Sequence, residues 1–275
     1  MIRLIKQLHR SFKRRRHARV ARPRLEALRP DVERVLGGAV RFSPTEGGGR
    51  DFVFYVSRDG RRAAVLRIAN GRYVPDDMPV AARLNGPRLR LTSRERIARE
   101  HRICAAGAPG GLTPAPLWLS EARDAAMNSY LEGERLLSCV RAGRIGLWDA
   151  IGRAAARALE FHAAVGEAHM DLSLMNILSV PADGRLVLID FELAPNPALS
   201  PEEARLFDFL NLVEMAYKFM SPADKREAPR RLQQLFTETV PPELRLASVA
   251  PLAAKLPRIL TDPVFRGTLA LTLNV

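Results

Sequence analysis

Between Ala39 and Ala69, apolar residues alternate with polar ones, and this alternation predicts β-strands. The chain reads AVRF, then DFVFYVSRDG, then RRAAVLRIA, with many β-branched and aromatic residues. The RDGR segment has the composition of a tight turn, so we expect antiparallel hairpins here. Two more strands are expected in GGLTPAPLWLSE and DAAMNSYLEG.

Helical spacing takes over in the second half of the chain. In LWDAIGRAAARALEFHAAV, residues 147–165, apolar positions recur every three or four residues and predict a helix. An earlier helix should begin at a Thr92 or Ser93 cap and end near Ala106. The intervening segment 70–91 is interrupted by Pro and Gly, which predicts a loop.

The predicted fold class is α+β, with a small antiparallel-sheet half followed by a larger helical half. Short strands at NILSV and RLVLIDF should interrupt the helical half, and helices should follow from Pro201. The expected domains are a basic amphipathic N-terminal extension (1–30), a strand-rich domain (31–133) and a helical domain (134–275).

The positive charge of the chain is concentrated at its N-terminus. The formal net charge is +13, residues 1–24 hold ten Lys and Arg residues, and the first acid is Glu26. Apolar residues also recur there every three to four positions, at Ile2, Ile5, Leu8 and Phe12. This pattern predicts a short basic amphipathic helix lying in an anionic membrane interface. The alternatives are a solvated tail, a helix packed on the body, and a mitochondrial transit peptide.

Composition is that of a globular protein with a real core, since 47% of the 275 residues are hydrophobic. Two cysteines are too few for a disulfide framework or a zinc cluster. No apolar run approaches the ~18 residues that a membrane span needs. We therefore expect a cytoplasmic protein, either free or peripheral on the cytoplasmic face of the inner membrane.

The stretch EAHMDLSLMNIL carries the clearest chemistry. His169, Asp171 and Asn176 form H-x-D-x-x-x-x-N, and Asp190 follows nineteen residues after Asp171, at the end of LVLID. Phosphoryl transfer uses such a set: one Asp orients the acceptor hydroxyl, while the Asn and the second Asp hold Mg²⁺ against the triphosphate. The alternative is a loop whose polar side chains only satisfy backbone groups.

These segments resemble the protein-kinase-like superfamily, particularly aminoglycoside phosphotransferases, RIO-type kinases and lipopolysaccharide core sugar kinases. The resemblance covers about residues 37–215 and implies ATP and Mg²⁺ as cofactors. It implies that Asp171, Asn176, Arg67 and Glu100 are catalytic and that Asn176 and Asp190 bind the metal. His169 would hold the loop backbone, and Asp208 would be a buried anchor.

The resemblance also assigns nucleotide-binding residues in the first half. Glu100 falls where the family has the glutamate of its third helix, called helix C. The remaining positions are the glycine-rich loop and the hinge that presents backbone groups to adenine, namely Gly47, Gly48, Gly49, Tyr130, Leu131 and Glu132.

Two departures separate this chain from conventional protein kinases. The family has Lys where AVLRI places Arg67, which keeps the positive charge and can pair with Glu100 and phosphate. Glu192 replaces the usual glycine of D-F-G, and no A-P-E segment follows.

The leading hypothesis is an ATP- and Mg²⁺-dependent phosphotransferase acting on a hydroxyl of a small molecule or glycolipid. The most favoured acceptor is a lipopolysaccharide core sugar at the cytoplasmic membrane face. One alternative is a RIO-like kinase or ATPase bound to RNA through the basic tail. The other is a nucleotide-binding pseudokinase scaffold, suggested by Arg67. Nucleic acid is the less favoured partner, because the tail has only Phe12 as an aromatic residue.

Overall fold

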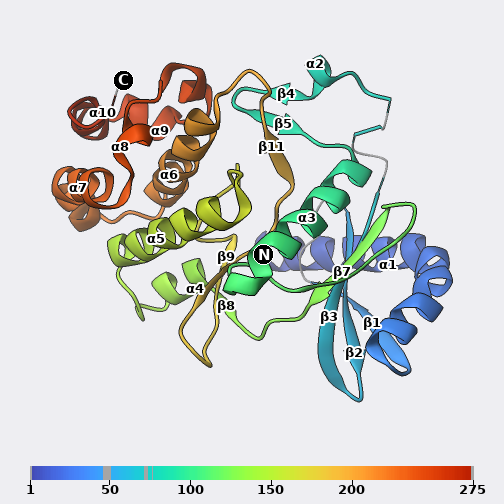
Figure 1. The fold of residues 1–275 in the computed structure, drawn as a ribbon. Helices are drawn as coiled ribbons and strands as arrows, with labels where there is room; N and C mark the ends of the chain where they lie inside the picture. The colour runs from blue at the N-terminus through green and yellow to red at the C-terminus, as the bar shows by residue number, and fades with distance from the viewer. Residues whose placement is uncertain (1, 46–50, 71–73, 76, 274–275) are drawn as a thin grey trace. The chain divides into compact units, whose positions relative to one another are not determined.

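The computed structural model describes residues 2–45, 51–70, 74–75 and 77–273, with side chains from Arg19 onward. The chain divides into two compact units. The first unit comprises residues 1–77, 92–105 and 114–131, and the second comprises 78–91, 106–113 and 132–275. Figure 1 shows the elements of both.

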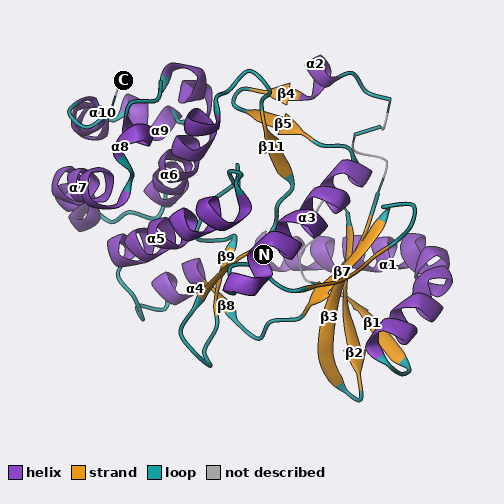
Figure 2. Cartoon of the chain, viewed as in Figure 1, coloured by secondary structure: helices purple, strands orange, loops and turns teal. Residues whose placement is uncertain are grey.

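A five-stranded antiparallel sheet forms the first unit, with strand order β1-β2-β3-β7-β6 (Figure 2). Its strands are β1 (Val40–Pro44), β2 (Phe52–Arg58), β3 (Arg61–Ile68), β6 (Pro116–Leu119) and β7 (Ala125–Ser129). Asp59 and Gly60 turn the chain between β2 and β3 with φ of 51° and 77°, which favours the glycine there. The predicted hairpins are confirmed.

Helix α1 (Ile2–Leu36) is longer than the predicted segment of residues 1–24. Pro23 and Pro30 lie inside it and each lacks an amide donor. Across both prolines, side chains spaced three to four residues apart join the core cluster with the sheet residues of the first unit: Ala21, Leu25, Leu28 and Val32. Their burial offsets the missing hydrogen bonds. The predicted apolar stripe of Ile2, Ile5, Leu8 and Phe12 lies outside the residues whose side chains are described.

Helix α3 (Ser93–Gly107) begins where its cap was predicted. The Thr92 hydroxyl accepts a hydrogen bond from the Glu95 amide at 3.3 Å, and the Glu95 carboxylate accepts one from the Thr92 amide at 2.7 Å. This reciprocal pair satisfies two amides at the helix start. Ile97 and Ile103 are completely buried and hold the helix in the core.

Helices dominate the second unit, which confirms the α+β class. Helix α5 (Leu147–Val165) buries one apolar face, as its spacing predicted. Helix α6 (Pro201–Tyr217) begins at a Ser200–Glu203 capping box. The other described helices of this unit are α2 (Val80–Arg83), η1 (Ala108–Gly110), α4 (Leu136–Arg141), α7 (Pro222–Gln234), η2 (Leu235–Thr239), α8 (Pro242–Arg245), η3 (Ala250–Lys255), α9 (Pro257–Thr261) and α10 (Pro263–Ala270).

Two small antiparallel sheets complete the second unit. One has the order β10-β9-β8 and consists of β8 (Glu134–Arg135), β9 (Ile177–Ser179) and β10 (Leu186–Leu188). The other has the order β11-β5-β4 and consists of β4 (Leu84–Asn85), β5 (Arg88–Arg90) and β11 (Leu193–Pro195). Figure 1 shows β5 beside β11, although they lie about a hundred residues apart in the chain.

The loop predicted for 70–91 is therefore wrong over residues 80–90, which form α2 and the β4–β5 hairpin. The short strand β5 is stabilised by pairing with β11. Such non-local pairing leaves no signal in the local sequence. In the described part of the chain, no helix has both the length and the apolar character of a membrane span.

Candidate functional site

Asp171 and Asn176 lie together in the loop between α5 and β9. The Asn176 side-chain nitrogen donates to the Asp171 carbonyl at 2.9 Å and to its carboxylate at 3.0 Å. These two bonds orient the amide, so that its oxygen is left as an acceptor for another partner. The predicted motif therefore brings its Asp and Asn side chains into direct contact.

A buried carboxylate holds the backbone of this loop. Asp208, in α6, is completely buried and accepts hydrogen bonds from the amides of His169 at 2.6 Å and Met170 at 2.8 Å. His162 lies 2.9 Å from the same carboxylate through Nε2. Met170 has a φ of 66°, a conformation that a non-glycine residue adopts only when its surroundings impose it. The anchor role predicted for Asp208 is confirmed.

His169 connects this loop to the segment that carries Asp190. Its Nε2 lies 3.0 Å from the Ile189 carbonyl, and its Nδ1 accepts the Asp171 amide at 3.3 Å. The imidazole therefore uses Nε2 as donor and Nδ1 as acceptor. As predicted, the ring holds backbone and has no proton-accepting nitrogen left for a substrate.

Asp190 follows β10 and lies next to the residue that bonds Asn176. The Ile189 amide donates to the Asn176 carbonyl at 2.9 Å, and Asp190 has a φ of 73°. A carboxylate oxygen and an amide oxygen, as these two residues carry, are hard ligands of the kind that Mg²⁺ prefers. Among the described residues, no three His, Cys, Asp or Glu side chains gather as a metal cluster. A Mg²⁺ ion bound by the oxygens of Asn176 and Asp190 would take its other ligands from water and phosphate.

Arg88 is a residue of this site that sequence analysis missed. One of its terminal nitrogens lies 3.3 Å from the Asp171 carboxylate and donates to the Asn211 side-chain oxygen at 2.7 Å. Its guanidinium carbon lies 4.9 Å from the ring centre of Phe207. Asn211 also donates to the Leu172 carbonyl at 2.8 Å, so one side chain positions both the arginine and the loop. No local signal marks Arg88, because its position depends on the β5–β11 pairing.

The environment of Asp171 suits a proton acceptor. Burial raises the pKa of Asp171 above the usual range for an aspartate, the charge of Asp190 also raises it, and the Arg88 guanidinium opposes them. A carboxylate with a raised pKa binds a proton more readily than an ordinary one. The opposing charge of Arg88 favours the ionised form, which can accept the proton.

In the first unit, Arg67 forms the ion pair that the sequence predicted. Its Nε lies 2.9 Å from the Glu100 carboxylate, and Asn128 donates to the same carboxylate at 3.0 Å. Asp51 adds a second carboxylate 3.7 Å from Arg67. Asp51 is itself held by the buried Arg96, at 2.6 and 3.1 Å. This network joins the start of β2, strand β3 and helix α3.

The structure says less about the glycine-rich loop and the hinge, the other segments predicted to bind the nucleotide. Gly47, Gly48 and Gly49 lie outside the described residues. The Tyr130 amide donates to the Ala63 carbonyl at 2.9 Å and is thereby used within the sheet. Adenine recognition by this segment would therefore depend on the Tyr130 carbonyl and on the backbone groups of Leu131 and Glu132.

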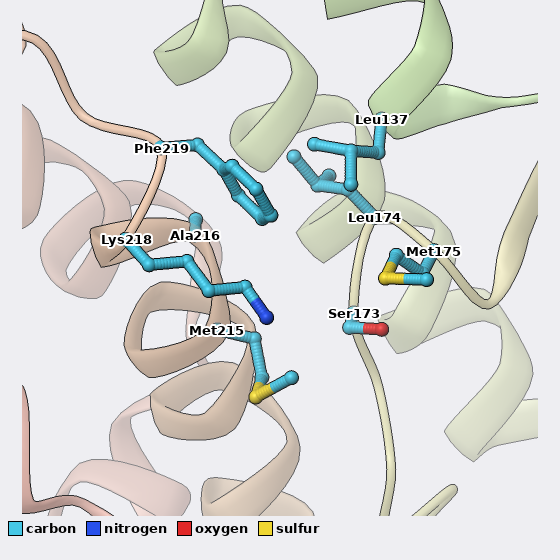
Figure 3. Close-up of a pocket in the computed structure, with 8 residues that line it drawn as sticks. All are labelled: Leu137, Ser173, Leu174, Met175, Met215, Ala216, Lys218 and Phe219. Atoms are coloured by element: carbon cyan, nitrogen blue, oxygen red, sulfur yellow. The ribbon is translucent and has the colours of Figure 1, made fainter. Parts of the chain in front are cut away.

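A small cavity in the second unit lies beside the loop that carries Asp171 and Asn176 (Figure 3). It is lined by Leu137, Ser173, Leu174, Met175, Met215, Ala216, Lys218 and Phe219. Its volume is about 10 Å³, which is no more than one water molecule requires. Figure 3 shows Met175, Met215 and the Lys218 amine directed toward this space. The cavity is too small to hold a sugar or a nucleotide.

No protein-family model matches the chain, and no curated protein gives a significant match. Solved structures do match it. One is a choline/ethanolamine kinase family protein from Mesorhizobium loti, with 16% sequence identity and a TM-score of 0.47, covering 84% of this chain and 92% of that one. A likeness at this level transfers neither substrate nor mechanism, so the function of this chain has to be proposed from its own residues.

Proposed function

We propose that this protein is an ATP- and Mg²⁺-dependent phosphotransferase that phosphorylates a hydroxyl group of a small molecule or glycolipid. One observation carries the proposal. Asp171 and Asn176 are hydrogen-bonded in a loop fixed by buried Asp208, and Asp190 follows a strand whose end bonds Asn176. A loop that needed only structural polar groups would not require a second carboxylate and a guanidinium beside Asp171.

In the proposed reaction, the acceptor oxygen forms a bond to the γ-phosphorus of ATP. The bond from that phosphorus to the β,γ-bridging oxygen breaks, and ADP leaves with its electron pair. Asp171 orients the acceptor hydroxyl and takes up its proton. Asn176 and Asp190 would hold Mg²⁺, which when bound neutralises negative charge on the phosphates. Arg88 holds the Asp171 carboxylate in place.

We assign nucleotide binding in the first unit to Arg67 and Glu100. Glu100 and Asn128 fix the direction of the guanidinium, so that Arg67 would present a positive charge to the phosphates. An arginine can bind two phosphate oxygens through its planar fork, whereas a lysine offers a single point charge. Arg67 is therefore compatible with nucleotide binding. A pseudokinase scaffold could also retain the pairing of Arg67 with Glu100. Measurements of ATP turnover distinguish an active phosphotransferase from such a scaffold.

The leading acceptor is a lipopolysaccharide core sugar at the cytoplasmic membrane face. The basic N-terminal segment supports this choice, because an anionic membrane would attract it toward a lipid-linked substrate. A RIO-like enzyme bound to RNA remains the alternative use of the same charges.

The substitution Asp171→Asn tests the chemistry. Turnover of ATP against a panel of core oligosaccharides, aminoglycosides and protein substrates should fall about 10²–10⁴-fold, since an amide cannot take up the hydroxyl proton. Affinity for MgATP should stay within a few fold. Asp183→Asn is the matched control, because this exposed aspartate in the β9–β10 turn pairs with nearby Arg185. Undiminished turnover by the Asp171 variant would remove Asp171 from the reaction.

A further inference from the structure

The β4–β5 hairpin carries two arginines on one side of a short strand. Arg88 and Arg90 are two residues apart in β5, so their side chains leave the strand on the same face. Arg88 reaches the Asp171 carboxylate, and Arg90 is exposed. The pairing of β5 with β11 fixes this strand beside the segment that follows Asp190. The hairpin therefore brings positive charge to the proposed site of phosphoryl transfer.

Lys255, from the end of η3, packs over the turn of the same hairpin. A Cβ added to Gly86 would lie 3.6 Å from Cγ and 3.8 Å from Cε of Lys255. Burial lowers the pKa of Lys255, and repulsion from Arg88 and Arg90 lowers it further. We call Arg88, Arg90 and Lys255 the hairpin cluster. The Lys255 amine is close enough to both arginines for their charges to repel it.

Acidic side chains act on this cluster at Arg88, whose charge is stabilised by the carboxylates of Asp171 and Asp208. Among the described residues, Asp171 is the one carboxylate paired with it, through Arg88, and neither Arg90 nor Lys255 forms an ion pair. The Nε of Arg88 is buried and has no hydrogen-bond partner. Holding like charges together costs free energy, and a buried donor without a partner adds to that cost. An anionic ligand would offset the repulsion among these charges.

We propose that the hairpin cluster binds a phosphate or carboxylate group of the acceptor, so that a hydroxyl of the same molecule reaches Asp171. This inference rests on the phosphotransferase proposed above and narrows its substrate to an anionic alcohol. Arg and Lys side chains form strong, short hydrogen bonds with both kinds of anion. A neutral sugar would gain nothing from the cluster, and a cationic alcohol would be repelled by it.

Binding to the full-length chain without ATP tests the proposal directly. The probes are D-glucose 6-phosphate and D-glucuronate as the two anions, D-glucose as the neutral molecule and choline as the cation. We expect the anionic probes alone to raise the melting temperature. The double variant Arg90→Gln/Lys255→Gln should weaken their binding about tenfold or more. The charge-conserving variant Arg90→Lys/Lys255→Arg should largely retain it.

A matched control separates a local site from general charge. Arg226→Gln/Arg266→Gln removes two charges from exposed positions elsewhere in the second unit and should leave binding of the anionic probes unchanged. The proposal is overturned if neither anionic probe binds, or if both double glutamine variants weaken binding equally. It is also overturned if the Arg90/Lys255 variant loses MgATP affinity instead, since the cluster would then serve the nucleotide. Absence of MgATP binding by the unaltered chain would count against the phosphotransferase itself, whatever the probes do.

Discussion

In the proposed metal site, Asp190 and Asn176 would offer Mg²⁺ two different kinds of oxygen, a charged carboxylate and a neutral amide. The Asn176 side chain is held in a fixed orientation, because its nitrogen is already bonded to Asp171. A carboxylate attracts a divalent cation by its full charge, whereas an amide contributes a dipole. The two side chains should therefore differ in how strongly their loss affects the metal.

We predict that Asp190→Ala removes most of the Mg²⁺-dependent stabilisation by ATP and that Asn176→Ala removes less. Asn176→Ala should lower turnover more than it lowers binding, because it also releases the Asp171 carboxylate. Thermal-shift titration with ATP, with and without Mg²⁺, measures the stabilisation, which grows with ligand concentration relative to Kd. Asp183→Ala is the control. A full Mg²⁺-dependent shift in the Asp190 variant would exclude Asp190 from the metal site.

Helix α1 contributes to the core of the first unit as an element, beyond the charge it carries. Leu28 is 4% exposed within the cluster that includes sheet residues, whereas Val35 on the same helix is 37% exposed. Leu28→Ala should lower the free energy of unfolding by about 2–5 kcal/mol, since it leaves a cavity in a packed core. Val35→Ala should change it by about 0.5 kcal/mol or less. Urea denaturation of the full chain measures the free energy of unfolding of both variants. A change for Leu28→Ala as small as that for Val35→Ala would show that the helix does not stabilise the sheet.

Elements whose pattern is local could be predicted from the sequence. Strands β1 to β3 alternate, the turn carries Asp59 and Gly60, and α5 has a continuous apolar face, so each was predicted. The extent of α1 was not, because the run of basic residues suggested an end near residue 24. The apolar spacing in fact continues through Pro23 and Pro30 to Val32.

The same contrast applies to the candidate site. His169, Asp171, Asn176 and Asp190 could be recognised because they lie close together in sequence at fixed spacing. Arg88 could not, because it reaches Asp171 from a hairpin about eighty residues earlier, through the non-local pairing of β5 with β11. Short strands of two or three residues have almost no intrinsic preference that would reveal them in advance.

At the scale of the whole molecule, helix α1 has two parts of different character. From Ala21 onward it is packed in the first unit, and Arg24 pairs with Asp124 at 2.6 Å. Residues 1–18 carry seven Lys and Arg residues and no acid, namely Arg3, Lys6, Arg10, Lys13, Arg14, Arg15 and Arg16. A truncation that tests membrane binding should therefore end before Arg19, so that the buried part of the helix is kept.

We predict that deleting residues 1–18 abolishes sedimentation with anionic liposomes and leaves MgATP binding intact. Each basic residue near such a surface contributes about 1 kcal/mol to binding. Salt screens this attraction over ~8 Å, so added salt should weaken the binding.

Replacing Ile5, Leu8 and Phe12 by Ser keeps every charge and removes the apolar stripe. If the segment lies in the membrane interface, this triple variant should lose liposome binding, because apolar burial stabilises the bound helix by ~25 cal/mol per Å². If the segment binds RNA, the variant should still bind RNA in a salt-sensitive way, because phosphate contacts do not depend on the stripe. Retained liposome binding together with strong RNA binding would favour the RNA-bound alternative over the membrane-associated enzyme.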